Sequence, residues 1–377
     1  MKKILFVIGT RPEAIKMAPL IKRLAKNEKF SVAVCATAQH RGMLDQVLNL
    51  FEIKPDFDLN IMRPNQDLSD VTSLVLLGVR GVIKEFQPDV VLVQGDTTTC
   101  FAAALAAFYA NVRIGHVEAG LRTGNLREPF PEEGNRLLTS RLADWHFAPT
   151  AINRENLLRE GISDNKICIT GNTVIDALLW VRDLTLQNPQ SFSGNIWGTA
   201  APYINAESRI VLITGHRREN FGSGFRNICA AIATLAEKHS DWQFIYPVHL
   251  NPNVQAPVFE LLSNTPNVHL ISPLDYAPFV FLMNKARIIL TDSGGVQEEG
   301  PALGKPVIVM RDVTERPEAV RSGTALLVGT DTERIVKETE PLMLDETRYN
   351  AMARAHNPYG DGQASERISS FLDSVLL

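Results

Sequence analysis

Ser293, Gly294 and Gly295 form a corner that could hold a phosphate group. They follow an apolar run of strand length and precede the segment 296–303, which has the composition of a short helix. Because the two glycines lack Cβ atoms, a ligand can approach their backbone, and the N–H groups at a helix N-terminus attract anions. Glu299 falls within the first helical turn, where its carboxylate can accept both hydroxyl groups of a ribose. A tight turn followed by a glutamate that offsets the helix dipole is the alternative.

Three carboxylates could exchange protons with a substrate. Asp96 and Glu118 each follow a predicted strand, and Glu132 lies in a proline-containing segment before a helix predicted over 135–143. The carboxyl ends of parallel strands meet at one edge of a sheet, so we expect these acids around one cleft. Carboxylates held close together repel one another, which favours retention of a proton on one of them and suits proton transfer. Capping of helix N-termini is the alternative for each acid.

Four basic side chains are expected at the same kind of edge. Arg11 lies on the loop after the first predicted strand, and Lys16 lies about one turn inside the helix that follows. His216 and Arg316 follow later strands. The loop that carries Arg11 has a single glycine and no Gly-Lys-Ser/Thr, so it matches neither the dinucleotide-binding fingerprint nor a P-loop. The cations therefore point to anion binding, with a solvated basic patch as the alternative for Lys16.

The elements that position these residues are alternating strands and helices, which predict an α/β fold with parallel sheets. The chain has 377 residues, more than a single core usually supports, so we expect two domains. Residues 184–206 lose periodicity and gather Pro, Gly, Ser and Asn, which predicts a linker. The last residues form an amphipathic helix, 361–377, which we expect to return to the first domain.

Composition limits the classes of function. A net charge of −4 gives no long-range attraction for nucleic acid or anionic membranes. No apolar run approaches the ~20 residues of a membrane span, and the run after Lys2 and Lys3 is too short for a signal peptide. The four cysteines form no CxxC pair, and Asp56 and Asp58 are interpreted as turn residues, so no metal site is predicted. We expect a cytoplasmic protein without a cofactor.

The ordered motifs resemble those of the non-hydrolysing UDP-N-acetylglucosamine 2-epimerases. They include GTRPEAIKMAPL, GDTTT, HVEAGLRT, TGHRREN and LTDSGGVQEE, and the match runs from near Lys3 to near Phe371. The resemblance implies GT-B architecture, in which two Rossmann-like doubly wound domains face a central cleft. The N-terminal domain would be 1–183 with the helix 361–377 packed back on it, and the UDP-binding domain would be 207–360. The resemblance also implies a homodimer and production of UDP-N-acetylmannosamine for surface polysaccharides.

The resemblance also assigns roles to individual residues. The implied catalytic set is Asp96, Glu118, Glu132 and His216, and the first two would also contact the substrate. The diphosphate and ribose would be held by Ser293, Gly294, Gly295 and Glu299, and the diphosphate charge would be neutralised by Arg11, Lys16, His216 and Arg316. Phe279 would lie in a loop that approaches the uracil. In some members UDP-N-acetylglucosamine is also an activator held partly by the region of Gln39 and His40, but Gly42 and Asn65 replace longer polar residues seen there.

The chemistry implied by the resemblance is elimination followed by addition. UDP leaves C1 as the C2 proton is removed, which gives 2-acetamidoglucal, and UDP then adds back while C2 is protonated on the opposite face. Cations would stabilise the departing diphosphate and carboxylates would carry the protons, without NAD or a metal. The alternatives are a hydrolysing epimerase, a GT-B glycosyltransferase and a non-catalytic nucleotide-sugar sensor.

Overall fold

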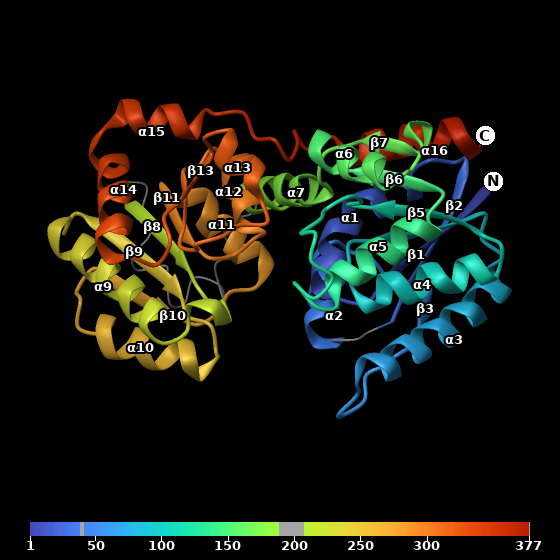
Figure 1. Ribbon diagram of the computed structural model, residues 1–377, viewed down its shortest axis with the longest axis horizontal. Coiled ribbons are helices and arrows are strands. Elements are labelled where there is room, and N and C mark those ends of the chain that lie inside the picture. The colour runs from blue at the N-terminus through green and yellow to red at the C-terminus, as the bar shows by residue number, and fades with distance from the viewer. Residues whose placement is uncertain (38–40, 188–206, 377) are drawn as a thin grey trace. The chain divides into compact units, whose positions relative to one another are not determined.

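The computed structural model describes residues 1–37, 41–187 and 207–376, which fall into two compact units (Figure 1). Unit 1 comprises Met1–Ala177 and Tyr359–Leu377, and unit 2 comprises Leu178–Pro358. Helix α7, Thr173–Gln187, runs through the boundary between them, so the first four residues of the predicted linker are helical. The rest of that predicted linker lies outside the described residues.

Unit 1 is built on a seven-stranded parallel sheet with the order β3-β2-β1-β4-β5-β6-β7. Its strands are β1 (Lys2–Ile8), β2 (Phe30–Ala36), β3 (Phe57–Asp58), β4 (Val90–Gln94), β5 (Arg113–Val117), β6 (Trp145–Ala148) and β7 (Ile167–Ile169). Strands β1, β4 and β5 are almost wholly buried, as expected for a parallel sheet that is covered on both faces. The strand order reverses between β1 and β4, and open α/β sheets bind ligands outside the carboxyl ends at such a switch point.

Helices cover both faces of this sheet. They are α1 (Arg11–Ala25), α2 (Arg41–Leu50), α3 (Leu68–Phe86), α4 (Thr98–Tyr109), α5 (Glu132–Leu142), α6 (Ala151–Arg159), the first part of α7, and α16 (Ala364–Leu376), with the short 3-10 turn η1 (Asp164–Lys166). Helices α3, α4 and α5 pack side by side, and α1 packs against α2 and α16. Helix α5 begins at Glu132, three residues before the predicted start, so two glutamates occupy its first turn. Carboxylates are favoured there by the helix dipole.

The C-terminal helix α16 belongs to unit 1. The ring of Phe371 packs edge-on against Phe147 of β6, with 5.5 Å between centroids. The carboxylate of Asp176 caps the start of α16, because it accepts hydrogen bonds from the backbone N–H groups of Ala364 and Ser365. The end of the chain is thus fixed to the unit that contains its beginning.

Unit 2 repeats the doubly wound pattern with a six-stranded parallel sheet of order β10-β9-β8-β11-β12-β13. Its strands are β8 (Arg209–Thr214), β9 (Trp242–Pro247), β10 (Val268–Ile271), β11 (Ile288–Thr291), β12 (Val307–Val309) and β13 (Ala325–Leu327). Its helices are α9 (Ser223–Lys238), α10 (Pro252–Leu262), α11 (Tyr276–Lys285), α12 (Val296–Ala302), α13 (Pro317–Arg321), α14 (Thr332–Leu344) and α15 (Glu346–Ala353), with the 3-10 turn η3 (Arg218–Asn220). The α/β class with two Rossmann-like sheets, predicted from sequence, is confirmed.

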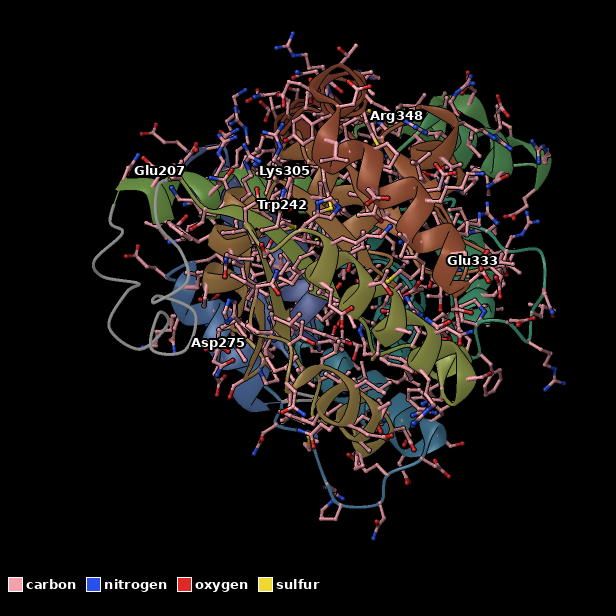
Figure 2. The ribbon with its side chains drawn as sticks, turned by 90° about the vertical axis from the view of Figure 1, so that its left-hand side faces the viewer. Glu207, Trp242, Asp275, Lys305, Glu333 and Arg348 are labelled. Atoms are coloured by element: carbon pink, nitrogen blue, oxygen red, sulfur yellow. The ribbon has the colours of Figure 1, made fainter. Side chains whose placement is uncertain are left out.

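The core of unit 2 lies between its sheet and the helices α9, α10 and α14. Trp242 at the start of β9 is buried inside it, whereas Glu333 on α14 and Arg348 on α15 are exposed (Figure 2). The order of this sheet reverses between β8 and β11, so the loops after these two strands meet at its switch point.

Candidate active site

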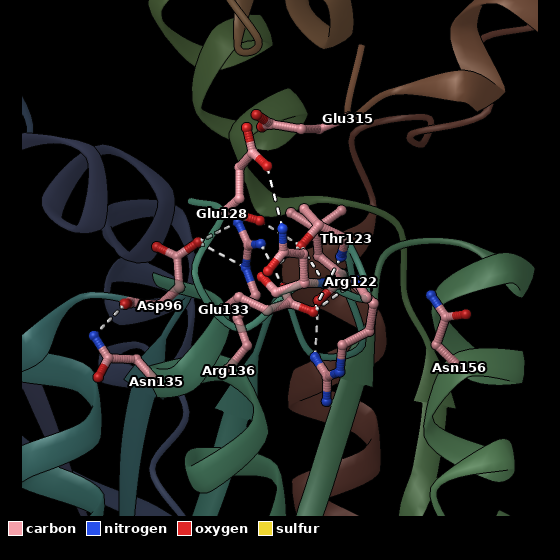
Figure 3. Close-up of polar contacts among 12 residues, drawn as sticks. Asp96, Arg122, Thr123, Glu128, Glu133, Asn135, Arg136, Asn156 and Glu315 are labelled. Atoms are coloured by element: carbon pink, nitrogen blue, oxygen red, sulfur yellow. Dashed lines mark hydrogen bonds and ion pairs between the residues drawn. The ribbon is translucent and has the colours of Figure 1, made fainter. Parts of the chain in front are cut away.

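Asp96 emerges at the carboxyl end of β4, directly after Gly95, whose φ is +72°. Two nitrogens of Arg136 on α5 bind the same carboxylate oxygen, with Nε at 3.0 Å and Nη2 at 2.7 Å from Oδ2 of Asp96 (Figure 3). The side-chain amide of Asn135 donates to the backbone carbonyl of Asp96 at 2.9 Å. Helix α5 therefore fixes both the backbone and the charge of this acid.

Glu118 lies at the carboxyl end of β5, next to β4. Its backbone adopts the left-handed region, with φ of +63°, which is uncommon for a residue other than glycine. Lys16 Nζ lies 2.5 Å from Oε2 of Glu118, and the side-chain amide of Gln94 donates to the same oxygen. The predicted cation of α1 and the predicted acid of β5 therefore form a nearly buried ion pair.

Glu132, the first residue of α5, differs from the other two acids. Its Oε2 atom is buried and has no hydrogen-bond partner among the described residues. Asp96 and Glu118 each have a cation within ion-pair distance, whereas no ion pair to Glu132 is found in the parts of the chain that the structure describes. Among the described residues, two of the three predicted acids are thus paired with a cation and the third is not.

Glu13 is a functional candidate that the sequence reasoning missed. Its buried carboxylate accepts hydrogen bonds from the backbone N–H groups of Gly9 and Thr10 and from the Thr97 hydroxyl, at 3.1, 2.7 and 2.8 Å. Burial raises its pKa above the ordinary value, although these hydrogen bonds oppose the rise. Glu13 joins the loop that precedes Arg11 to the loop that contains Asp96. The available signal was Thr10 followed three residues later by glutamate, a capping box.

Two buried histidines support the same region from inside the sheet. His116 on β5 and His146 on β6 are register partners, and neither is exposed. A ring nitrogen of His116 lies 2.7 Å from the carbonyl oxygen of Gly95, next to Asp96. Burial lowers the pKa of His116 to about 4 and that of His146 to about 3, so both rings are neutral near pH 7. Sequence periodicity gave no sign of them, because both fall inside apolar strands.

The corner Ser293–Gly295 of unit 2 follows β11 and leads into α12. A Cβ atom added to Gly294 would lie 3.6 Å from Nη2 of Arg217, and one added to Gly295 would lie 3.8 Å from Oε2 of Glu299, so the backbone of both residues is bordered by charged side chains at van der Waals distance. Asp292, which is wholly buried before the corner, accepts hydrogen bonds from the backbone N–H groups of His216 and Arg217, both at 2.9 Å. Asp292 thus fixes the loop after β8 to the loop after β11.

The imidazole of His216 lies over that junction. It stacks on His249 with 5.4 Å between ring centroids, and its Nδ1 lies 3.5 Å from Oδ1 of Asp292. Desolvation lowers the pKa of His216, and the carboxylate of Asp292 acts in the opposite direction. Its ring is therefore oriented by one acid and one aromatic neighbour.

Helix α12 carries two buried glutamates with different partners. Glu299 accepts a hydrogen bond from the Tyr276 hydroxyl at 3.0 Å, and both residues are buried. Glu298 forms an ion pair with Arg316, so the predicted diphosphate cation is anchored by the helix next to the corner. Gly304 ends this segment with φ of +66°, in the left-handed conformation that glycine adopts easily after a helix.

Three site predictions need correction or lie outside the described residues. Phe279 is not in a loop but in the first turn of helix α11, because Asp275 caps that helix and accepts the N–H of Phe279. Gln39 and His40 lie outside the described residues.

Within the described ranges no cluster of His, Cys, Asp or Glu could hold a metal ion. In the same ranges no helix is long and apolar enough to cross a membrane.

The two doubly wound sheets have the GT-B-like fold, which a glycosyltransferase of kitacinnamycin shares at 14% identity with a TM-score of 0.65. That likeness shows the fold alone. A family model for UDP-N-acetylglucosamine 2-epimerase matches residues 22–373. The chain therefore belongs to the UDP-N-acetylglucosamine 2-epimerase family, whose members are isomerases, and the resemblance recognised from its motifs is confirmed.

Individual relatives agree over nearly the full length. The UDP-N-acetylglucosamine 2-epimerase of Escherichia coli K12 is 60% identical and covers 97% of each chain. The crystal structure of the Neisseria meningitidis enzyme bound to UDP-GlcNAc is 53% identical, covers 99% of this chain and 100% of that one, and has a TM-score of 0.90. The Methanocaldococcus jannaschii enzyme in complex with UDP-GlcNAc and UDP is 35% identical, covers 99% of each chain and has a TM-score of 0.80.

Proposed function

We propose that this chain interconverts UDP-N-acetylglucosamine and UDP-N-acetylmannosamine by inverting C2, without hydrolysing the nucleotide sugar. Family membership supports the reaction. The observation that carries the mechanism is the unequal pairing of three acids in unit 1: Asp96 and Glu118 are held by Arg136 and Lys16, whereas Glu132 has no cation partner among the described residues. A reaction that removes a proton from one face and returns one to the other needs both an ionised and a protonated acid.

The chemistry is an elimination followed by an addition. An ionised carboxylate, Asp96 or Glu118, takes the C2 proton; the C–H electrons form the C1–C2 double bond, and the C1–O bond to UDP breaks. In the second half, a UDP oxygen attacks C1 of the 2-acetamidoglucal while C2 takes a proton from the opposite face. We assign the supply of that proton to Glu132, the remaining acid of the set. After the turnover one acid has gained a proton and another has lost one, and exchange with water restores both.

The nucleotide is assigned to unit 2. Ser293, Gly294 and Gly295 bind the diphosphate through their backbone, and Glu299 accepts the ribose hydroxyls. Arg316 and His216 stabilise the leaving diphosphate, each being held in place by a buried acid. Phe279 contacts the uracil from the first turn of α11. Arg11 and Lys16, from unit 1, act on the same substrate.

The biological setting follows the family resemblance. The enzyme acts as a homodimer in the cytoplasm, uses UDP-N-acetylglucosamine, UDP-N-acetylmannosamine and UDP as its ligands, and supplies a precursor for surface polysaccharides. Gln39 and His40 are the positions to test for activation by UDP-N-acetylglucosamine. Light scattering of the purified chain checks the oligomeric state, and a mass of one chain would contradict the dimer.

One assay separates the proposed reaction from its alternatives. The enzyme is incubated with UDP-N-acetylglucosamine in D2O without an acceptor, and proton NMR is recorded with time. Deuterium at C2 in nucleotide sugars of both configurations supports the proposal. Free N-acetylmannosamine with UDP would indicate a hydrolysing epimerase, and unchanged substrate would leave a transferase or a sensor.

A further inference from the structure

Arg136 and Glu133, two neighbours on α5 that are absent from the predicted site, form a buried link to Asp96. Nη1 of Arg136 lies 3.0 Å from Oε2 of Glu133, while the opposite side of the same guanidinium binds Asp96. Glu133 in turn accepts the backbone N–H groups of Thr123 and Gly124 through its other oxygen, both at 3.1 Å (Figure 3). The loop after β5, helix α5 and the loop after β4 are thus joined by one chain of charged hydrogen bonds.

We infer that Arg136 and Glu133 are positioning residues that set the orientation of Asp96 and the electrostatic field around it in the proposed epimerase reaction. This inference rests on the proposed function. Neither residue needs to touch the substrate, because the guanidinium reaches the acid from the side of α5 and is itself buried. Two N–H groups on one carboxylate oxygen fix its direction as well as its charge, which a single cation on a flexible stem would not do.

The charges in this link are shared unequally. One guanidinium faces two carboxylates, so Asp96 and Glu133 compete for its positive charge. Burial alone would lower the pKa of Arg136, but Asp96 and Glu133 together raise it above its ordinary value, so the guanidinium stays charged. The two residues therefore act on the negative charge of Asp96 in opposite directions: Arg136 attracts it, and the like charge of Glu133 repels it.

This opposition gives a test that a merely structural role would not pass. Arg136→Lys keeps a charge but loses the paired N–H contacts to Asp96, so the acid side of the kcat/KM profile moves to higher pH. Glu133→Gln removes the competing charge, so the same side moves to lower pH. We expect shifts of about one pH unit in opposite directions, because a neighbouring charge moves an acid by roughly one to three units. Arg136→Lys also lowers kcat by ~10²-fold, the effect of a misplaced reacting group.

Arg122 provides a matched control in the same unit. It is also nearly buried, and it binds Glu160 through Nε and Nη2 at 2.6 and 2.9 Å and Ser140 through Nη2. None of its recorded contacts in the described residues involves Asp96, Glu118 or Glu132. Arg122→Lys should therefore lower the melting temperature about as much as Arg136→Lys. It should leave the acid side of the kcat/KM profile at the same pH as in wild type.

The experiment measures epimerisation of UDP-N-acetylglucosamine from pH 5 to 9, UDP affinity and melting temperature for the full-length wild type and the three variants. Opposite shifts for the Arg136 and Glu133 variants, with UDP affinity within about twofold of wild type, support the inference. The inference would be overturned if kcat/KM fell at the same acidic pH in Arg136→Lys as in wild type. Shifts in the same direction for the Arg136 and Glu133 variants, or a shift in Arg122→Lys, would also overturn it. If Arg136→Lys does not fold, the sign of the Glu133→Gln shift decides alone. Failure of the proposed function is distinct, because the wild type would then not epimerise at all.

Discussion

The two units use the same doubly wound sheet, but the pairs Asp96–Arg136 and His216–Asp292 bury opposite members. In unit 1, Asp96 is 27% exposed and its partner Arg136 only 7%. In unit 2, His216 is 42% exposed and its partner Asp292 is wholly buried. The more exposed member of each pair is the one that can meet a ligand, so unit 1 offers an acid and unit 2 offers a base. The buried partner in each case provides orientation.

One pair in unit 1 follows the pattern of unit 2. Lys16 is more exposed than its partner Glu118. This agrees with the assignment of Lys16 to the diphosphate, since a cation that meets an anionic ligand must remain accessible. The comparison therefore contrasts the accessible acid Asp96 with the accessible basic side chains Lys16 and His216, and substitutions in each unit can test that contrast.

Removal of either cation-paired acid in unit 1, Asp96 or Glu118, should give the largest effect. Asp96→Asn and Glu118→Gln each lower kcat by ~10²–10⁴-fold, the usual contribution of a positioned acid or base, while UDP still binds. Steady-state kinetics and calorimetric titration with UDP measure the two quantities separately. Near-normal turnover in either variant would remove that residue from the mechanism, and a parallel loss of UDP affinity would erase the difference between the units.

Loss of an accessible cation in unit 2 should affect binding as well as rate. Arg316→Ala weakens UDP binding by ~10–10²-fold, because a charged hydrogen bond contributes about 1.5–3 kcal/mol. It also leaves Glu298 buried without its cation, so the double variant Arg316→Ala/Glu298→Gln is the matched control that removes this strain. UDP affinity equal to wild type in both variants would contradict the role of Arg316.

The buried histidines of unit 1 should make its stability depend on pH. Burial lowers the pKa of His116 to about 4 and that of His146 to about 3. Below the ordinary histidine pKa of about 6.5, both side chains therefore take up protons in the unfolded chain but not in the folded protein. The contribution of these two neutral histidines to the free energy of unfolding is therefore fully present above pH 6.5 and is lost as the pH falls toward 4. Linkage gives a loss of about 2 kcal/mol per histidine at pH 5.

Urea unfolding of wild type and His146→Gln at pH 7.5 and 5 measures this loss. The variant keeps His116, so it should lose about half as much stability between the two pH values as wild type. Equal losses would show that His146 does not contribute, and no loss in wild type would contradict the burial of both rings in neutral form.

The glycine that ends α12 should have the smallest effect, confined to stability. Gly304 has φ of +66°, so Gly304→Ala costs about 1 kcal/mol in the free energy of unfolding. Gly81 in the middle of α3 has no such requirement and open space around it, so Gly81→Ala should stabilise by about 0.5–1 kcal/mol. Thermal denaturation checks both signs, and a stabilised Gly304→Ala would show that the helix end is not fixed by its backbone.

The sequence predicted the strand ends well, because buried parallel strands are short apolar runs that stop where polar loops begin. Asp96, Glu118 and the Ser293–Gly295 corner were found from this pattern. The start of α5 was predicted three residues late, since the prolines at 129 and 131 suggested an interruption that the helix begins directly after. Phe279 was assigned to a loop by the family resemblance, whereas it lies in the first turn of α11.

The partners of the site residues could not be predicted in the same way. No sequence motif singled out Arg136 or Glu133, and only packing of α5 against the loop after β4 brings them to Asp96. Lys16 and Glu118 are 102 residues apart, and no local pattern links them. Pairing of charges across elements depends on side-chain direction in the folded sheet, which strand and helix periodicity do not specify.

The left-handed backbone of Glu118 places a limit on how stable this protein can become. A side chain with a Cβ atom in that conformation costs roughly 1–2 kcal/mol, whereas glycine adopts it freely. Glycine at position 118 would relieve this cost, but it would also remove the carboxylate and break the nearly buried ion pair with Lys16. The backbone strain at this position is therefore retained together with the charge that the site needs.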